Sequence, residues 1–229
     1  MPARLGIGVV TGTQADAALA RALGLRVASC GGIAGRAEDL AEELVDEQGV
    51  VALVSFGLAA GLSPALPAAA VLVASGVMPE QGGRPLVTDD VWRTNLLRSL
   101  PQALTGLVLG VERPLLSAAE KGELFAATTA VAADAESLGV AEVAARRALP
   151  CVVLRAICDP ADADMPPAAF AALLRQGEPS LTAALRRPRD LPALMRTVRQ
   201  VRQARAALAA ALPVLADCLP HRAVRAAPP

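Results

Sequence analysis

Aromatic residues are scarce in this sequence, which limits what the protein can bind. Three Phe, one Trp and no Tyr occur in 229 residues, so the aromatic platforms on which single-stranded nucleic acids stack are nearly excluded. Cationic charge is not in excess either, because 22 Lys and Arg are balanced by 22 Asp and Glu. Proteins that grip nucleic acid through its phosphates depend on such an excess. We therefore expect no nucleic-acid partner.

Histidine and closely spaced cysteines are also lacking. The single histidine, His221, lies near a Pro-rich end, and Cys30, Cys151, Cys158 and Cys218 show no CxxC or paired spacing. This argues against Ser-His-Asp chemistry, a metal site and a disulfide framework. The N-terminal apolar stretch is too short for a secretory signal. We predict a cytoplasmic protein with reduced thiols and no metal.

One long stretch lacks charge altogether, from Gln48 to Pro79. It exceeds the roughly 20 residues that a membrane-spanning helix needs. Its β-branched run at Val50–Val54, the Gly- and Pro-containing segment 55–64 and a second short run at Val71–Val73 favour a different structure. We predict a strand, a Gly-rich loop and a buried strand.

Short apolar runs alternate with amphipathic segments along most of the chain, a pattern typical of a sheet covered on both faces. We predict a single domain over 1–219 and a flexible Pro-rich tail over 220–229. Thr88 can cap one helix, and Ser117 with Glu120 forms a capping-box pair. The predicted strands cover 5–10, 50–55, 71–74, 107–111, 129–133 and 151–157, and the helices cover 16–23, 37–48, 117–125 and 136–148, a helix from Thr88, another from Pro166–Pro167 and a long terminal helix from Asp190.

Polar residues just beyond strand ends are candidates for chemistry, because the loops there can line a crevice. Three places qualify: residues 11–13, residues 55–61, and the acids Glu136 and Asp159, each of which follows an apolar strand. Two carboxylates from separate strands can hold different protonation states, as acid catalysis beside a developing positive charge requires. Alternatively, Glu136 is only a first-turn helix acid and Asp159 only caps the loop into Pro160.

The segments around these acids resemble a known family signature. Residues 133–137, Ala-Asp-Ala-Glu-Ser, and 152–162, Val-Val-Leu-Arg-Ala-Ile-Cys-Asp-Pro-Ala-Asp, resemble the purine nucleoside phosphorylase and nucleosidase superfamily. Residues 55–66 are similar to its Gly-rich segment. Together with Cys-Gly-Gly at 30–32 and Asp-Met-Pro-Pro at 164–167, the sequence resembles in particular the hopanoid-associated phosphorylases. The resemblance spans about residues 5–215.

The resemblance implies a nucleoside phosphorylase-like, three-layer α/β/α fold with a central mixed sheet. It also implies cleavage of the N-glycosidic bond of adenosylhopane, which releases adenine and gives ribosylhopane or its 1-phosphate in bacteriohopanepolyol synthesis. Position by position, Asp159 matches the acid that protonates the purine at N7, and Glu136 the carboxylate that binds the ribose hydroxyls. Small residues that would let the backbone approach the sugar or the nucleophile are Gly57, Ala59 and Ala60.

Two departures from the family pattern concern the pocket. Ala135 stands where the superfamily commonly has Met, so the ribose pocket is expected to be roomier. The loop from Val111 to Leu116 offers no aromatic side chain, so the purine would contact aliphatic groups. Such a pocket suits a purine nucleoside with an apolar 5′ substituent.

The nucleophile is open between water and phosphate. Hydrolytic relatives use a Glu in the helix after the first strand, where this chain has Gln14 and Asp16. Asp16 can serve as the base only if the helix turns it inward. A phosphorylase needs an anion cradle, for which Gly12, Thr13 and Arg36 are candidates. Because no Glu is in place, the sequence favours phosphorolysis, with inorganic phosphate as co-substrate and no cofactor.

Two other functions compete with this interpretation: a nucleosidase acting on soluble methylthioadenosine or adenosylhomocysteine, and a non-catalytic nucleoside or lipid binder. The arginines at 186–189 and 196–205 fit a solvated helix face or a surface that attracts anionic lipid headgroups at the inner membrane. Relatives commonly form dimers or larger assemblies, so a homo-oligomer is expected.

Four further residues receive simpler interpretations. We predict that Trp92 is a core anchor and that Lys121 is a surface charge. Cys158 is interpreted as a small buried residue at the end of a strand. Arg155 is expected to pair with a buried carboxylate.

Overall fold

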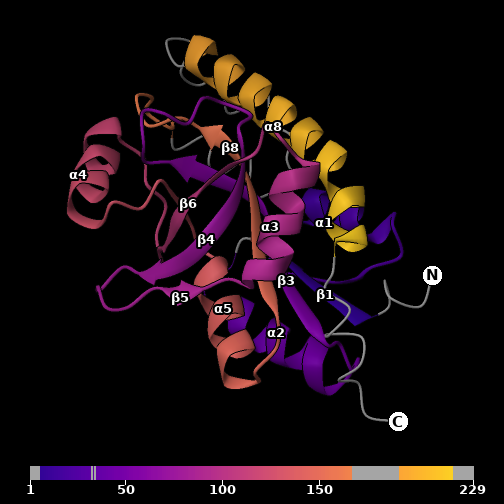
Figure 1. The fold of residues 1–229 in the computed structure, drawn as a ribbon. Helices are drawn as coiled ribbons and strands as arrows, with labels where there is room; N and C mark the ends of the chain where they lie inside the picture. The colour runs from indigo at the N-terminus through magenta and orange to yellow at the C-terminus, as the bar shows by residue number, and fades with distance from the viewer. Residues whose placement is uncertain (1–5, 32, 34, 167–190, 219–229) are drawn as a thin grey trace.

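The computed structural model describes residues 6–31, 33, 35–166 and 191–218, and the predicted helix from Pro166–Pro167 and the tail 220–229 lie outside them. Strands alternate with helices over most of this part of the chain (Figure 1). The elements are β1 (Ile7–Thr11), α1 (Gln14–Arg21), β2 (Arg26–Ser29), α2 (Arg36–Asp46), β3 (Ala52–Gly61), β4 (Val71–Pro79), β5 (Leu86–Val87), α3 (Asp90–Ser99), β6 (Leu104–Gly110), α4 (Ala118–Thr128), β7 (Ala132–Asp134), α5 (Ser137–Arg146), β8 (Cys151–Asp159) and α8 (Leu191–Asp217).

The strands form one mixed sheet, in which the pairings of β3, β8, β4, β6 and β7 make a closed ring. Strand β3 pairs with β8 in parallel, β8 with β4 antiparallel, β4 with β6 in parallel, β6 with β7 in parallel, and β7 returns antiparallel to β3. Strands β1 and β2 extend the sheet beyond β3, and β5 lies beside β4. Strand β7 is antiparallel to β3. The residues that follow β7 therefore lie beside the middle of β3.

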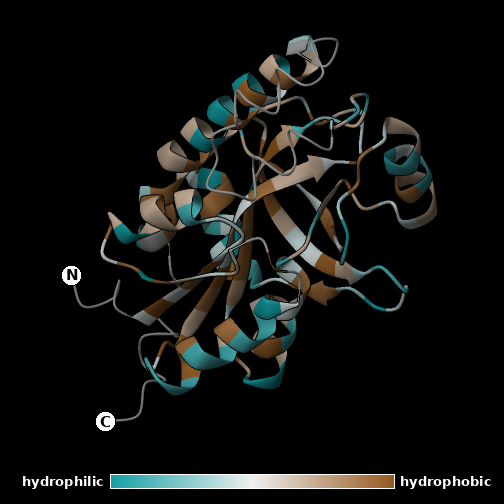
Figure 2. Cartoon of the chain, turned by 180° about the vertical axis from the view of Figure 1, so that it is seen from behind, coloured by the Kyte–Doolittle hydropathy of each residue, from teal (hydrophilic) through white to brown (hydrophobic). Residues whose placement is uncertain are grey.

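Helices cover both faces of this sheet, which confirms the predicted mixed α/β fold (Figure 1). Helices α1, α3 and α8 pack on one face around Phe56, Trp92 and Leu208. Helices α2 and α5 pack together on the other, where Leu44 and Val140 are fully buried. In Figure 2 the strands are largely hydrophobic, whereas the helices carry hydrophilic as well as hydrophobic residues.

The uncharged stretch from Gln48 to Pro79 contains two strands, and both extend further than the sequence predicts. Residues 55–61 belong to β3 rather than to a Gly-rich loop, because β8 continues to pair with β3 as far as Ala60, opposite Asp159. Strand β4 likewise extends to Pro79. Among the described residues, no helix combines the length and hydropathy required for crossing a bilayer.

Helix starts depend on local capping, and one of the two predicted caps is wrong. Ser117 caps α4 by accepting from the N–H of Glu120, as predicted. Helix α3 is capped by Asp89, which accepts from the N–H of Trp92, while the hydroxyl of Thr88 donates to the carbonyl of Ala74. Thr88 therefore joins α3 to β4 and is not the cap.

We expect Trp92→Ala to destabilise the fold by about 3–5 kcal/mol, the usual cost of removing a large buried aromatic side chain. Trp92 is fully buried, as predicted, and its indole N–H donates to the carbonyl of Leu215 at 3.1 Å, which joins α3 to α8. Urea unfolding followed by circular dichroism measures the change. The neighbouring Val91→Ala, at a side chain that is 59% exposed, should change stability by less than about 0.5 kcal/mol. Equal effects of the two substitutions would contradict the packing described.

Candidate active site

A cavity of about 290 Å³ gathers most of the residues singled out from the sequence. Its lining includes five acidic residues, among which are the three predicted from the sequence, Asp16, Glu136 and Asp159. Five further predicted residues also line it, namely Gly12, Thr13, Ala59, Ala60 and Ala135. Gly57 lies close by on β3, whereas Arg36 is exposed at the start of α2 and is not among the lining residues.

The sheet topology explains how distant acids meet here. Asp159 ends β8, which runs parallel to β3, and it is paired with Ala60. Strand β7 runs the opposite way, with Ala133 also paired to Ala60. The chain leaving β7 therefore carries Glu136 along β3 away from Asp159, so the two carboxylates face one cavity from opposite directions.

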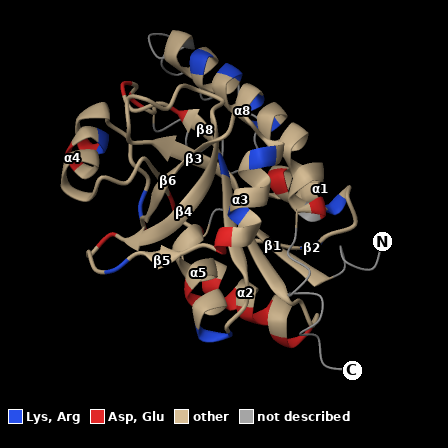
Figure 3. Ribbon diagram, in the orientation of Figure 1, with Lys and Arg blue, Asp and Glu red and all other residues tan. Residues whose placement is uncertain are grey.

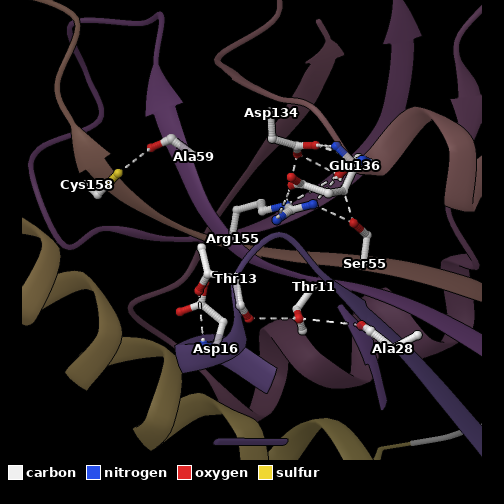
Figure 4. A network of polar contacts seen from close by, with 11 residues as sticks. Thr11, Thr13, Asp16, Ala28, Ser55, Ala59, Asp134, Glu136, Arg155 and Cys158 are labelled. Atoms are coloured by element: carbon white, nitrogen blue, oxygen red, sulfur yellow. Dashed lines mark hydrogen bonds and ion pairs between the residues drawn. The ribbon is translucent and has the colours of Figure 1, made fainter. Parts of the chain in front are cut away.

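Glu136 is positioned by the turn that starts α5. The carboxylate of Asp134 accepts hydrogen bonds from the N–H groups of Glu136 and Ser137 at 2.8 and 2.7 Å, and the Ser137 hydroxyl donates to it at 2.6 Å. An aspartate that binds free helix-start amides fixes the first turn in the same way as an N-cap. Asp134 thus has a structural role, which leaves the side chain of Glu136 directed toward the cavity (Figure 4).

Arg155 pairs with both of these carboxylates, which confirms that it partners a buried acid. Its side chain is fully buried, with Nε 2.9 Å from Asp134 Oδ2 and Nη1 3.3 Å from Glu136 Oε2. Its Nη2 donates to the Ser55 hydroxyl at 2.5 Å (Figure 4). A Cβ added to Gly57 would lie 2.8 Å from Nη1, so glycine on the central strand makes room for the guanidinium.

The surroundings of Glu136 bring its pKa close to neutrality, to about 7. Burial raises the pKa of Glu136, and the negative charges of Asp134 and Asp16 raise it further, while Arg155 opposes them. The space at Gly12 is restricted, as it is at Gly57, because a Cβ on Gly12 would lie 2.6 Å from Glu136 Oε1. The backbone after β1 therefore lies directly against the Glu136 carboxylate.

Helix α1 does turn Asp16 inward, where its side chain is 1% exposed. The Thr13 hydroxyl donates to Asp16 Oδ2 at 2.7 Å, and Arg205 of α8 lies 3.0 Å from Oδ1 through its Nε. Thr13 also caps α1 through the N–H of Asp16. The long C-terminal helix thus contributes a cation to a site otherwise built from the sheet.

Lys121 is not a surface charge, and the prediction that placed it on the surface is wrong. Its side chain is fully buried, and Nζ lies 2.5 Å from Asp159 Oδ2. The apolar pattern around Lys121 in α4 offers no signal of this, because its partners are about 40 residues further along the chain. Burial raises the pKa of Asp159 to about 6, although Lys121 acts in the opposite direction.

Cys158 is the cysteine that lines the cavity among the described residues, and its surroundings do not favour a thiolate. Burial raises the pKa of Cys158 to about 12, and those of Cys30 and Cys151 similarly, so the thiols stay protonated at neutral pH. Cys158 is buried as expected. No metal-binding cluster of His, Cys, Asp or Glu occurs within the ranges that the structure describes. A larger open groove of about 1270 Å³ beside α3 and α5 contains none of the predicted site residues.

The model of one protein family, described as the phosphorylase superfamily, matches residues 26–187. The chain belongs to the phosphorylase superfamily. This membership confirms the predicted enzyme class, that of purine nucleoside phosphorylases and nucleosidases. None of the curated proteins matches the chain significantly.

Solved structures of superfamily enzymes share the fold at low sequence identity. Futalosine hydrolase of Helicobacter pylori is 16% identical, with a TM-score of 0.71 over 93% of this chain and 97% of that one. The 5′-methylthioadenosine/S-adenosylhomocysteine nucleosidase of H. pylori, with butyl-thio-DADMe-Immucillin-A, is 16% identical, with a TM-score of 0.70 over 93% and 98%. The same nucleosidase from Neisseria meningitidis is 15% identical, with a TM-score of 0.68 over 92% and 97%.

Proposed function

We propose that this superfamily member cleaves the N-glycosidic bond of a purine nucleoside that carries an apolar 5′ substituent, with Asp159 as the acid and Glu136 as the ribose ligand. One observation carries the proposal: the two carboxylates line the same cavity but have different cationic partners, Lys121 and Arg155. Separate environments allow one carboxyl group to donate a proton while the other accepts hydrogen bonds.

The proposed chemistry follows the charge that develops as the C1′–N9 bond breaks. The bonding electrons pass to the purine, and positive charge develops on the sugar, as in other glycosidic cleavages. Asp159 gives its proton to N7 of the leaving purine. Because burial raises the pKa of Asp159 to about 6, the group holds that proton at a higher pH than an exposed aspartate would. Glu136 accepts hydrogen bonds from the ribose hydroxyls, and in its ionised form, which Arg155 favours, it places negative charge near the sugar.

We further propose that water is the nucleophile and that Asp16 is its base. Supporting this, Asp16 lies in the cavity while Arg36, needed for the proposed phosphate cradle, is exposed outside it. An ionised carboxylate has about four lone-pair sites, so the bonds from Thr13 and Arg205 leave Asp16 able to accept another. The water oxygen bonds to C1′ and its proton passes to Asp16.

The cavity wall supports an apolar 5′ substituent. Leu58, Val111, Pro114, Leu115 and Met165 line it, and no aromatic side chain lines it among the described residues. One superfamily neighbour was solved with 5′-methylthioadenosine in its active site, which supports a nucleoside with a small apolar 5′ group. Adenosylhopane extends the same chemistry to a lipid, and it is the substrate that we propose.

The proposal of a lipid substrate extends to contact with a membrane. Helix α8 carries four arginines, of which Arg205 pairs with Asp16 in the cavity, and its one acidic residue is Asp217 at the C-terminal end. Figure 3 shows the cationic positions spaced along this helix. Arg196 and Arg199 are exposed, and cationic side chains are attracted to anionic headgroups. We propose that this face brings the cavity near the lipid surface.

Asp159→Asn should lower kcat for adenine release by about 10²- to 10⁴-fold, the usual contribution of a general acid. The wild type should lose kcat/KM as the pH rises above about 6, because Asp159 then loses its proton. Adenine release measured across pH by chromatography tests both expectations. Asp162→Asn, a neutralisation at an exposed carboxylate three residues away, should leave the rate unchanged. If Asp159→Asn released adenine as fast as the wild type, Asp159 would not be the acid.

Adenosylhopane presented in anionic vesicles should release adenine with a higher kcat/KM than methylthioadenosine does, because the apolar lining rewards a larger 5′ group. The assay compares both substrates in the same buffer with the same concentration of anionic vesicles and no detergent. A preference for methylthioadenosine would favour a nucleosidase with a soluble substrate. Failure to cleave any purine nucleoside, combined with measurable nucleoside binding, would favour a non-catalytic binder.

Adenine release should be equally fast with and without inorganic phosphate, and Asp16→Asn should slow it by about 10²-fold or more because the base is lost. The sugar product, analysed by mass spectrometry, should carry a free hydroxyl at C1′. Gln14→Ala, at an exposed side chain in the same helical turn, is the matched control. A strict requirement for phosphate, together with a sugar 1-phosphate product, would show that the reaction is phosphorolysis and not hydrolysis.

A further inference from the structure

The proposed reaction gives Lys121 no role of its own beyond pairing with Asp159. Its ammonium group lies 2.5 Å from Asp159 Oδ2 and donates to the carbonyls of Pro160 and Ala163 at 3.0 and 2.8 Å. An ammonium group has three N–H donors and no acceptor. These three partners account for all of them, so Lys121 can act on a substrate only through Asp159.

The loop after Asp159 is also joined to the start of α4 by hydrogen bonds that do not involve the carboxyl group of Asp159. The Ala118 N–H donates to Asp164 Oδ1 at 2.8 Å, and the Met165 N–H donates to the Leu116 carbonyl at 2.9 Å. The loop therefore has two hydrogen bonds to the start of α4 that do not involve Lys121, one accepted by the Asp164 carboxylate and one between backbone groups. A role confined to fastening the loop would not require a buried cation in contact with the carboxylate.

Burying that cation is costly. Removing an ammonium group from water carries a large penalty that a single ion pair often fails to offset, and apolar replacements of such pairs are commonly as stable. Lys121 is fully buried and Asp159 is nearly so. The ion pair is therefore weak evidence for a stabilising role, and its position on the proposed acid needs another reason.

The charge on Lys121 complements the charge that Asp159 acquires during the reaction. When the O–H bond of Asp159 breaks and the N7–H bond of the purine forms, the carboxyl group becomes a carboxylate. A fixed cation aimed at the place where charge develops stabilises the transition state more than the ground state. Lys121 is already in contact with Oδ2, so no reorganisation of solvent is needed.

We propose that Lys121 is a positioning residue for the acid: it fixes the carboxyl group of Asp159 through Oδ2, leaves Oδ1 for the purine, and stabilises the carboxylate left after proton transfer. This rests on the proposed function, because it assigns Asp159 as the proton donor. The charged groups that act on this carboxyl are Lys121 from α4, Asp164 from the loop and Arg196 from α8. Across the cavity lie the pairs Asp16–Arg205 and Glu136–Arg155.

Two substitutions, which replace charged side chains of opposite sign by neutral ones, test the proposal. Lys121→Gln removes the cation but keeps hydrogen-bond donors, and Asp164→Asn removes an anion but keeps Oδ1 as acceptor for Ala118. We expect Lys121→Gln to lower kcat by about tenfold or more with KM changed less than about threefold. The alkaline limb of its pH profile should move up by about one unit, because an opposite charge no longer favours ionisation. Asp164→Asn should keep the rate, and its limb should move in the opposite direction if at all.

A second measurement separates this proposal from the proposed function. Titration of the Asp159 carboxyl carbon by NMR, assigned with Asp159→Asn, requires no turnover, and its midpoint should rise in Lys121→Gln and not in Asp164→Asn. Lys121→Arg, which keeps the charge, should restore the midpoint, and thermal melting identifies variants that fail to fold. An unchanged midpoint and pH profile in Lys121→Gln would overturn the proposal. Inactive wild type with a shifted midpoint would instead overturn the proposed function alone.

Discussion

The ion pairs of Arg155 hold together two parts of the chain that the site requires. Arg155 lies in the middle of β8, while its partners Asp134 and Glu136 come from the turn between β7 and α5. Loss of one partner from a buried pair costs roughly 3–5 kcal/mol, because the remaining charge is left uncompensated. The guanidinium also bonds to Ser55 on β3. One side chain thus links three strands at the point where the cavity forms.

This buried guanidinium explains features of β3 that strand preferences alone would disfavour. Glycine weakens the interior of a strand, yet Gly57 lies in the middle of β3, where a Cβ would approach Arg155 Nη1 to 2.8 Å. Ala59 and Ala60 follow and form part of the cavity wall. Small residues here are therefore a requirement of the site, and the central position of β3 in the sheet supplies the hydrogen bonds that keep it extended.

The sequence predicts those features that depend on local pattern, and it misses those that depend on distant contacts. Apolar runs correctly indicate β1, β8 and the buried face of α8, and the pair Ser117 and Glu120 correctly marks a helix start. The extension of β3 to Gly61 depends on pairing with β7 and β8, which no local signal encodes. Lys121 and Arg205 were missed as site neighbours because their partners are far away in sequence. The positions of Asp159 and Glu136 after apolar strands mark them as candidates, whereas their separate roles follow only from resemblance to a family motif.

The charges around the cavity suit a reaction that creates a cation. The buried and partly buried ion pairs of the cavity join four carboxylates, those of Asp16, Asp134, Glu136 and Asp159, to three cations, Lys121, Arg155 and Arg205. If these seven groups are all ionised, together they carry one excess negative charge. Such a site takes up protons readily, and burial raises the pKa of Glu136 to about 7 and that of Asp159 to about 6. Once the proton of Asp159 has passed to the leaving purine, negative charge is restored to the cavity in which positive charge develops on the sugar. The excess negative charge, which burial makes costly when the cavity is empty, is therefore compensated by the sugar in the transition state.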